Sequence, residues 1–416
     1  MKAHAPPVTL AIAGRLPPTG GMATSSITAD GGDADAFEID GNRLTLLFEG
    51  DARRDALLAL IAGAERELRL LYYIYSADRV GTQVRDALVA ACARGVSVAL
   101  LIDGFGSQYT PADFFEPLRA AGGSVCRFLP RYGRRYLLRN HQKLALADGA
   151  RVLIGGFNID DSYFAPPEED GWRDLGLIVE GPAADHLTGY FDLVLGWARD
   201  PAATMRALNR GLVRSSQTTG TLRWLFGGPT KRLSPWARAL RRDIAMARRL
   251  DMIAAYFAPN PGMLRRIRRL ARRGTARIMT ASKSDNTMTI AAARNCYVRL
   301  LRRGARIWEY APTRLHTKLF VVDDIAFVGS ANCDMRSLYI NCEIMLRIED
   351  AAFAARLRRY AEAETGDAQE ASLDRIRRRS NVWMRTKWAI AYFIVAAVDY
   401  SVTRRVNFGR IGADIG

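Results

Sequence analysis

A short pattern that occurs twice is the feature that most constrains how this chain can fold. Residues 141–148 read HQKLALAD and residues 316–323 read HTKLFVVD, so both copies have the spacing H-x-K-x4-D and begin 175 residues apart. A second similarity, between residues 47–50 (LFEG) and 225–228 (LFGG), has an offset of 178 residues. Self-similarity at a nearly constant offset predicts two homologous halves.

The residues before the first copy predict alternating strands and helices. Apolar runs at 44–48, 67–75 and 96–102 indicate strands, and the stretches 51–64 and 80–94 indicate helices. This βαβαβ order predicts a largely buried parallel sheet. Because the second half repeats these features, we expect an α/β fold of two homologous domains, each a mixed, mostly buried sheet flanked by helices.

Composition divides the chain further. Residues 1–40 mix Pro, Gly, Ser, Thr and Asp without periodicity, and we interpret them as a disordered extension. The polar, apolar-poor stretch 214–220 is the best candidate for a linker. The predicted domains are therefore 41–213 and 214–365, and a basic, aromatic tail follows at 366–416.

Each copy of the pattern delivers an imidazole and an ammonium to one surface, because residues i and i+2 of a strand share a face. A Gly-Gly-Phe-Asn or Gly-Ser-Ala-Asn segment follows each copy, and a carboxylate comes later, in Trp-Arg-Asp or Asn-Cys-Glu. Two Lys and two Asn form a clamp suited to phosphoryl oxygens. Two His can divide the roles of nucleophile and acid.

These considerations give a set of candidate residues. The catalytic candidates are His141, His316, Lys143, Lys318, Asp148, Asp323, Asp174 and Glu343. The phosphate-binding candidates are Lys143, Lys318, Asn158, Asn332 and Ser330. Asp148 and Asp323 rank lowest, because they lie at predicted hairpin turns, where Asp commonly bonds the local backbone. Asp174 and Glu343 are better candidates for holding the second nitrogen of each imidazole.

With these motifs the sequence resembles the phospholipase D superfamily, and within it the bacterial cardiolipin synthases, over about residues 43–365. The narrower likeness rests on Trp172-Arg-Asp174, Tyr256-Phe-x-Pro259, Ser282-Lys-Ser-Asp285 and the segment 328–337. The resemblance implies one active site at a pseudo-two-fold interface between the two domains, with no metal and no cofactor. The common form of the family has two N-terminal membrane helices. No apolar run here reaches the roughly 18 residues of a spanning helix, so the likeness is to shorter variants.

The resemblance also implies a mechanism. One His attacks phosphorus to form a phosphohistidine, and the other protonates the leaving alcohol and then deprotonates the incoming one. By analogy we predict His141 as the nucleophile and His316 as the acid and base, although the symmetry of the pattern gives no local reason for that order. The incoming alcohol implied for a cardiolipin synthase is a glycerol hydroxyl of phosphatidylglycerol. Free glycerol and phosphatidylethanolamine remain alternatives, as does a hydrolase or nuclease of the same superfamily that uses water.

Charge indicates a polyanionic partner, because Lys and Arg exceed Asp and Glu by 17 and the pI is near 10.0. DNA and anionic lipid both attract such a chain, but no nucleic-acid-binding motif is visible. The basic and aromatic segment 131–139 is expected to rim the site, and the arginine-rich segment 263–273 to form a solvated surface helix. Five cysteines without C-x-x-C spacing indicate a reducing compartment.

The tail favours lipid over nucleic acid. Residues 375–387 contain six basic and no acidic residues, and the apolar, aromatic stretch 388–398 follows. A short helix of this kind is typical of a membrane interface. We therefore predict peripheral attachment to an anionic membrane, at the cytoplasmic face of the bacterial inner membrane. A helix packed on the core or in a dimer contact is the alternative.

Overall fold

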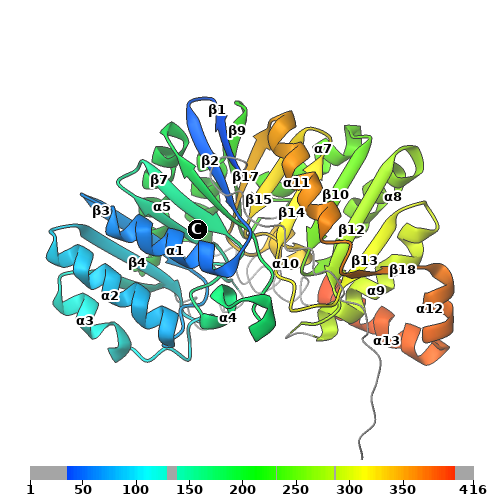
Figure 1. Ribbon diagram of the computed structural model, residues 1–416, viewed down its shortest axis with the longest axis horizontal. Helices are drawn as coiled ribbons and strands as arrows, with labels where there is room; N and C mark the ends of the chain where they lie inside the picture. Colours follow the sequence, from blue (N-terminus) through cyan, green and yellow to red (C-terminus); the bar gives the residue numbers. More distant parts are fainter. Residues whose placement is uncertain (1–34, 129–137, 231, 285–286, 399–416) are drawn as a thin grey trace, which may run out of the picture. The chain divides into compact units, whose positions relative to one another are not determined.

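The computed structural model describes residues 35–128, 138–230, 232–284 and 287–398. Within these ranges each predicted half contains a sheet of eight strands, and the described residues belong to one compact unit. The first half, blue to green, and the second half, green to orange, lie side by side in Figure 1. The prediction of two similar α/β halves is therefore confirmed.

The first half runs from residue 36 to residue 215. Its strands are β1 (Ala36–Ile39), β2 (Asn42–Leu47), β3 (Glu67–Tyr72), β4 (Ser97–Asp103), β5 (Ser124–Phe128), β6 (Leu144–Ala147), β7 (Arg151–Gly155) and β8 (Gly176–Glu180). Its helices are α1 (Gly50–Ala62), α2 (Arg79–Ala93), α3 (Glu116–Ala120), α4 (Asp161–Phe164), α5 (Pro182–Arg199) and α6 (Met205–Ser215). Short 3-10 turns lie at Asp113–Phe115 and Pro167–Glu169.

The second half begins after the predicted linker. Its strands are β9 (Leu222–Gly227), β10 (Arg249–Ala254), β11 (Phe257–Ala258), β12 (Thr275–Ala281), β13 (Arg306–Tyr310), β14 (Lys318–Val322), β15 (Ile325–Gly329), β16 (Cys333–Asp334), β17 (Glu343–Glu349) and β18 (Ala368–Ala371). Its helices are α7 (Pro235–Met246), α8 (Pro261–Arg273), α9 (Thr287–Leu301), α10 (Met335–Tyr339), α11 (Ala351–Ala363), α12 (Leu373–Arg379) and α13 (Val382–Phe393). A π-helical turn, Ile394–Val398, continues α13.

Both sheets are mixed. In the first sheet β3, β4 and β5 are parallel, whereas β6, β7, β8 and β2 continue it as antiparallel neighbours. The second sheet repeats this plan, with β10, β12 and β13 parallel and β14, β15, β17 and β9 antiparallel. The mixed sheet class is confirmed. The parallel βαβαβ prediction is wrong for β2, because the β6–β7 hairpin and β8 lie between it and β3.

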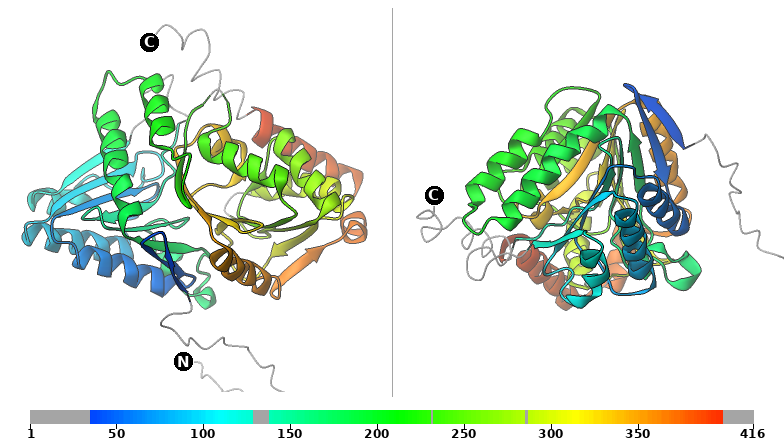
Figure 2. Two further views of the ribbon diagram at one scale, coloured as in Figure 1. Left: turned by 90° about the horizontal axis from the view of Figure 1, so that it is seen from above. Right: turned by 90° about the vertical axis from the view of Figure 1, so that its left-hand side faces the viewer.

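Apolar side chains form three layers of core. One layer lies under α1 and α2, on the outer face of the first sheet, and another lies under α7, α8 and α9, on the outer face of the second. The largest layer combines residues of both sheets with α5, α6 and α11, and it includes Leu144, Leu319 and Trp224. The two halves therefore share a core, and the two views in Figure 2 show α5 and α11 on the inner faces of the sheets.

Two boundaries differ from the sequence-based prediction. The predicted disordered extension 1–40 includes β1, which pairs antiparallel with β2; residues 1–34 lie outside the described residues. The predicted tail from 366 onward includes β18, which pairs antiparallel with β13 at the edge of the second sheet. Tertiary pairing organises both segments, although neither has a clear strand pattern of its own.

Candidate active site

The fold brings both His-x-Lys motifs to equivalent edges of the two sheets. His141 and Lys143 lie in the extended segment before β6, and His316 and Lys318 lie at the start of β14. Because β6 and β14 are antiparallel to β3 and β10, their first residues lie where those parallel strands end. The carboxyl ends of parallel strands are the usual place for a functional site in such sheets.

At this edge, backbone hydrogen bonds join segments of the first half to segments of the second. The His141 N–H donates to the Cys342 carbonyl at 2.9 Å, and the His316 N–H donates to the Arg173 carbonyl at 2.8 Å. In each case the segment that carries a histidine lies beside the segment that carries the carboxylate of the other half. Two isolated parallel β-bridges connect the halves at the same places: Asn140 pairs with Cys342, and Arg173 pairs with Leu315.

The imidazole–carboxylate pairs therefore cross between the halves. His141 Nδ1 lies 3.1 Å from Glu343 Oε2, and His316 Nδ1 lies 2.7 Å from Asp174 Oδ2. All four side chains are largely buried; the side chains of His141 and His316 are 12% and 5% exposed. With Nδ1 held by a carboxylate, Nε2 of each ring is the nitrogen left for chemistry.

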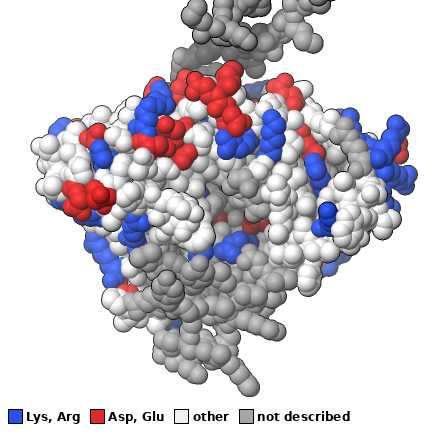
Figure 3. Space-filling model, turned by 90° about the horizontal axis from the view of Figure 1, so that it is seen from below, with Lys and Arg blue, Asp and Glu red and all other residues white. Residues whose placement is uncertain are grey.

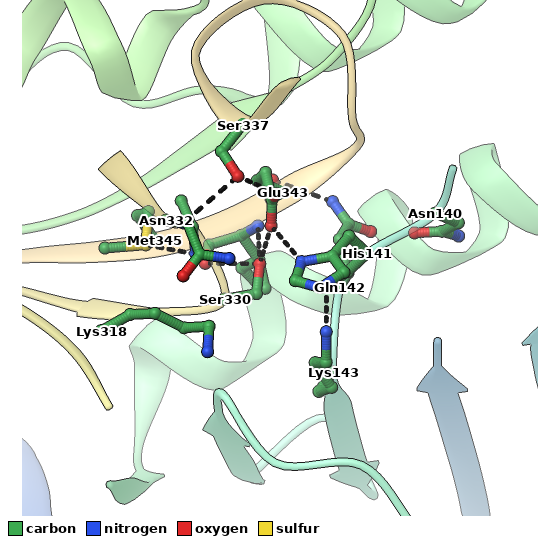
Figure 4. A network of polar contacts seen from close by, with 12 residues as sticks. Asn140, His141, Gln142, Lys143, Lys318, Ser330, Asn332, Ser337, Glu343 and Met345 are labelled. Atoms are coloured by element: carbon green, nitrogen blue, oxygen red, sulfur yellow. Dashed lines mark hydrogen bonds and ion pairs between the residues drawn. The ribbon is translucent and has the colours of Figure 1, made fainter. Parts of the chain in front are cut away.

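Two serines of the second half hold Glu343. The Ser330 hydroxyl donates to Glu343 Oε2 at 2.5 Å, and the Ser337 hydroxyl donates to Glu343 Oε1 at 2.7 Å. Figure 4 shows this carboxylate between the His141 ring and the two hydroxyls. The predicted phosphate-binding role of Ser330 does not fit, because its hydroxyl is committed to Glu343 and also accepts from the Ile344 N–H at 3.1 Å.

Asp174 is held differently. Its Oδ1 accepts from the Leu175 N–H at 2.8 Å, and its backbone carbonyl accepts from the fully buried guanidinium of Arg53 at 2.7 Å. Arg53 also donates to the carbonyls of Phe48 and Tyr163, which ties the start of α1 to this loop. Arg53 lies outside the motifs that predicted the site. A cation in register with Leu57 and Ile61, on the buried face of α1, was the available sign.

The two lysines are buried, and the ammonium group of each bonds the backbone of the histidine in its own motif. Lys143 Nζ donates to the His141 carbonyl at 2.7 Å, and Lys318 Nζ donates to the His316 carbonyl. Burial lowers the pKa of Lys143 well below its usual value. Figure 4 shows both ammonium groups on the same side of His141, and Figure 3 shows basic side chains within a hollow on the underside of the molecule.

The two asparagines lie on the loops after β7 and β15. Asn158 Oδ1 accepts from the Ile74 N–H at 3.1 Å, which leaves the amide nitrogen of Asn158 as the group that can donate. Asn332 is 2% exposed, and its Oδ1 has no partner among the described residues. A buried polar atom without a partner is uncommon and is typical of a site that a ligand completes.

Burial and neighbouring charges set the protonation states of the histidines and carboxylates of the site. Burial and the Lys143 ammonium lower the pKa of His141 to about 4, although Glu343 opposes them. Burial and the Lys318 ammonium lower the pKa of His316 to about 3, against Asp174. Burial raises the pKa of both carboxyls, but their histidine and lysine neighbours outweigh it, so both pKa values lie below their usual range. At neutral pH two neutral imidazoles therefore face two carboxylates.

Comparisons with known proteins agree with this geometry. The family described as "Cardiolipin synthase, PLD-like domain" matches residues 57–195 and 240–364, one match in each half. Cardiolipin synthase 1 of Bacillus cereus is 30% identical over 355 residues, which cover 82% of this chain and 70% of the relative. Cardiolipin synthase A of Pseudomonas entomophila is 31% identical over 338 residues, covering 79% and 70%. The chain belongs to the cardiolipin synthase-like family of the phospholipase D superfamily.

The resemblance stated from the motifs is thereby confirmed, including membership in a superfamily of enzymes. A solved structure, the phosphatidylserine synthase of Haemophilus influenzae Rd KW20, aligns with a TM-score of 0.66 at 15% identity. That alignment covers 86% of this chain and 94% of the other. At such low identity it supports the duplicated fold alone.

Asp148 and Asp323, which were predicted among the catalytic candidates, lie apart from the two histidines, so the structure does not bring them into the site. They lie at the β6–β7 and β14–β15 turns, at the far end of the strands from the histidines, with φ of 56° and 49°. Asp148 Oδ1 accepts from the N–H groups of Arg66 and Glu67 at 2.8 and 2.9 Å. Asp323 Oδ1 accepts from the Arg249 N–H at 2.8 Å. Each therefore fixes a hairpin to the start of the neighbouring strand, as the turn position suggested.

Aromatic rings flank each imidazole. The Tyr73 ring centroid lies 5.0 Å from that of His141. Tyr163 and Trp172 lie 5.0 and 5.3 Å from His316, both edge to face. Trp172 was part of the motif that carried the resemblance, whereas Tyr73 and Tyr163 were missed. These rings restrict the rotation of the imidazoles and exclude water from their faces.

One further anchor lies beside His141. Asp103, at the end of β4, accepts from the Asn140 N–H at 2.8 Å and so positions the residue before the histidine. Burial raises the pKa of Asp103 to about 6, although backbone N–H groups and Arg139 oppose this. Arg139 lies 3.8 Å from the Phe105 ring centroid. Residues 129–137, most of the basic and aromatic segment expected to rim the site, lie outside the described residues.

Proposed function

We propose that this protein is a phosphatidyltransferase that forms cardiolipin, or a related phospholipid, from phosphatidylglycerol. The observation that carries the proposal is the crossed pair of histidines, each held by a carboxylate of the other half, beside two buried lysines. The names of the relatives support phospholipid substrates. The site offers cationic groups for phosphoryl oxygens and two Nε2 atoms for group transfer.

In the first proposed step, His141 attacks phosphorus. Glu343 accepts a hydrogen bond from the Nδ1–H of His141, so the Nε2 lone pair is free to form the P–N bond while the bond from phosphorus to the leaving oxygen breaks. His316 gives its Nε2 proton to that oxygen, and free glycerol leaves when the donor is phosphatidylglycerol. The anionic phosphodiester beside Asp174 favours protonation of His316 when substrate arrives, because it adds negative charge next to the ring.

The second proposed step reverses these roles. A glycerol hydroxyl of a second phosphatidylglycerol gives its proton to His316 and forms a bond to phosphorus. The P–N bond breaks, and its electrons return to His141 Nε2. Lys143, Lys318, Asn158 and Asn332 would hold the non-bridging oxygens in both steps and stabilise the charge that builds up on them. Each step is a balanced exchange of one alcohol and one proton.

We place this reaction at the cytoplasmic face of the bacterial inner membrane. All five cysteines are free thiols, which fits a reducing compartment. In the part of the chain that the structure describes, no helix has both the length and the apolar character needed to cross a bilayer. Peripheral attachment to the membrane that carries the lipid substrates is the arrangement we propose.

The test is a product analysis with purified protein. Phosphatidylglycerol labelled in its phosphate would be incubated in detergent micelles, alone and with glycerol or phosphatidylethanolamine, and the lipids separated. Labelled cardiolipin from phosphatidylglycerol alone supports the proposal. His186→Gln is the matched control, because the His186 ring bonds the Ser215 carbonyl, outside the site. Phosphatidic acid as the sole product would indicate a hydrolase instead, and cleavage of DNA without lipid turnover would reject lipid chemistry.

A further inference from the structure

Helix α13 is apolar on two faces, and only one of them packs against the protein. Trp388 and Tyr392 lie against the outer core of the second half, and the Tyr392 hydroxyl donates to the Pro259 carbonyl at 2.8 Å. On the opposite side Val382 is 82% exposed, Trp383 65% and Phe393 60%. Large apolar side chains exposed to this degree are individually common, but several on one helix need an explanation.

Apart from Met384, the exposed large apolar residues of this segment form one continuous stripe. Trp383, Ile390 and Phe393 follow each other at spacings of seven and three residues, which places them on the same side of a helix. We call this stripe the apolar face of α13; its members are Val382, Trp383, Ile390, Phe393 and Ile394. At 12 residues, α13 is about 18 Å long, which suits a helix lying in an interface plane.

Cations flank this face, and they select one kind of partner. From Arg375 to Lys387 the chain has no acidic residue. Lys387 of α13 is exposed, and so are Arg377 and Arg378 of the preceding helix α12, where Arg377 lies 3.8 Å from Asp374. Lys387 Nζ lies 5.2 Å from the Trp383 ring centroid, so a cation borders the apolar face directly. Apolar and aromatic side chains bordered by cations complement an anionic phospholipid surface, where headgroups take the cations and acyl chains take the apolar groups.

The position of α13 relates this face to the active site. Pro259, which accepts the Tyr392 hydrogen bond, directly follows β11. Strand β11 pairs parallel with β16 (Cys333–Asp334), the two residues after Asn332 of the site. The inner face of α13 is therefore linked through one hydrogen bond and one strand pair to a loop that carries a phosphate-binding candidate.

We propose that the apolar face of α13 and its flanking cations dock the protein on an anionic phospholipid bilayer. This inference rests on the proposed function, since it adds how an enzyme acting on phospholipids would meet a bilayer of its substrate. Docking through α13 would keep the site edge at β11 and β16 near the headgroups. The composition of the tail predicted attachment to an anionic membrane, and the apolar face of α13 with its neighbouring cations assigns that attachment to specific residues.

The experiment measures vesicle binding by the full chain without any turnover. Vesicles of phosphatidylcholine, with or without about a third phosphatidylglycerol, would be separated by flotation. Three triple variants would be compared: Trp383→Ala with Ile390→Ser and Phe393→Ala; Arg377→Gln with Arg378→Gln and Lys387→Gln; and, as a matched control, Arg265→Gln with Arg269→Gln and Arg272→Gln. The control removes three exposed arginines from α8, where four arginines of the helix and Arg303 line a shallow pocket.

We expect the first two variants to bind anionic vesicles at least tenfold more weakly, and the α8 control to change binding less than threefold. Activity on detergent-dispersed lipid and the melting temperature should stay near those of the wild type. An equal loss in the α8 control would indicate diffuse charge attraction and overturn the proposal. So would unchanged binding of the Trp383 variant, or a wild-type dimer that this variant dissociates.

The outcome is independent of the proposed chemistry. Wild-type protein that floats with anionic vesicles through α13 but forms neither cardiolipin nor a related phospholipid would refute the proposed function and leave the docking surface intact. Protein that forms cardiolipin in detergent but does not float would refute the docking surface alone.

Discussion

Glu343 and Asp174 hold the two histidines of the site, but different groups hold the two carboxylates. Glu343 receives hydrogen bonds from the hydroxyls of Ser330 and Ser337. Asp174 receives the Leu175 N–H, and its loop is tied down by Arg53. The two homologous halves therefore share the imidazole–carboxylate contact but differ in the groups that hold the carboxylate in place.

One pair of equivalent positions accounts for part of this difference. Ser330, in Gly-Ser-Ala-Asn, corresponds to Gly156, in Gly-Gly-Phe-Asn. A Cβ at Gly156 would lie 2.6 and 2.7 Å from the two carboxylate oxygens of Asp174. The shorter Asp174 side chain thus occupies the space that a serine fills beside the longer Glu343. In each half the length of the carboxylate side chain therefore matches the size of the residue beside it: Asp174 lies beside Gly156, and Glu343 lies beside Ser330.

The two imidazoles also differ in access. The His141 side chain is 12% exposed and that of His316 is 5% exposed. Among the described residues, Tyr163 and Trp172 both pack against His316, whereas Tyr73 packs against His141. A nucleophile has to approach phosphorus directly, so the more open ring suits that role. This supports the proposed order of roles, which the symmetric sequence pattern left undecided.

The largest effect is expected from replacing either histidine. His141→Gln and His316→Gln should each lower turnover at least ~10³-fold, because nucleophile or acid is lost. Their single-turnover behaviour should differ: with phosphate-labelled lipid, His316→Gln protein should slowly retain label after denaturation, and His141→Gln protein should not. His186→Gln should behave like the wild type. Label on the His141→Gln protein alone would reverse the assigned roles.

A smaller effect is expected from exchanging the residues opposite the carboxylates. Gly156→Ser should lower kcat at least tenfold and destabilise the fold by about 1–3 kcal/mol, because its Cβ displaces Asp174. Ser330→Gly removes one hydrogen bond to Glu343 and should cost about 1–1.5 kcal/mol, or roughly five- to tenfold in kcat. Steady-state kinetics and denaturant unfolding measure both. If Ser330→Gly proved the more damaging change, the matching of acid and opposing residue would be wrong.

The sequence predicted the contents of the site better than its connections. The repeat identified both His-x-Lys motifs, because motif spacing is a local property of the chain. The family inferred from those motifs is confirmed by the relatives. The crossed pairing of His141 with Glu343 could not be predicted, since it depends on how the halves dock. The local pattern would have fitted pairing within one half equally well.

Other omissions have local causes. Strand β18 reads Ala-Gln-Glu-Ala, which has no strand pattern, and it forms only because β13 offers an edge. Arg53 was overlooked because a single cation in a helix usually faces solvent. Asp148 and Asp323 were included as candidates because they complete the repeated pattern. The repeat there preserves a turn that supports the sheet, which spacing alone cannot distinguish from catalysis.

The last effect we predict is a dependence of stability on pH. Both histidines have folded-state pKa values, about 4 and about 3, below the value near 6.5 expected when unfolded. Between pH 6.5 and pH 4 the unfolded chain therefore binds protons that the folded chain does not, so stability falls as the pH falls. The stabilising contribution of the two neutral histidines is fully present above about pH 6.5. Each histidine should contribute on the order of 1 kcal/mol per pH unit across that window.

The double variant His141→Gln/His316→Gln isolates this contribution, because glutamine does not titrate. Denaturant unfolding of the variant should depend less steeply on pH between 4 and 6.5 than that of the wild type. His186→Gln, which changes a histidine outside the site, should leave the steep dependence in place. Equal slopes for wild type and double variant would mean that the imidazoles are not held neutral by burial. Glu343 and Asp174 would then have to outweigh burial and the neighbouring lysines at one ring at least, which would favour that ring as the resting acid.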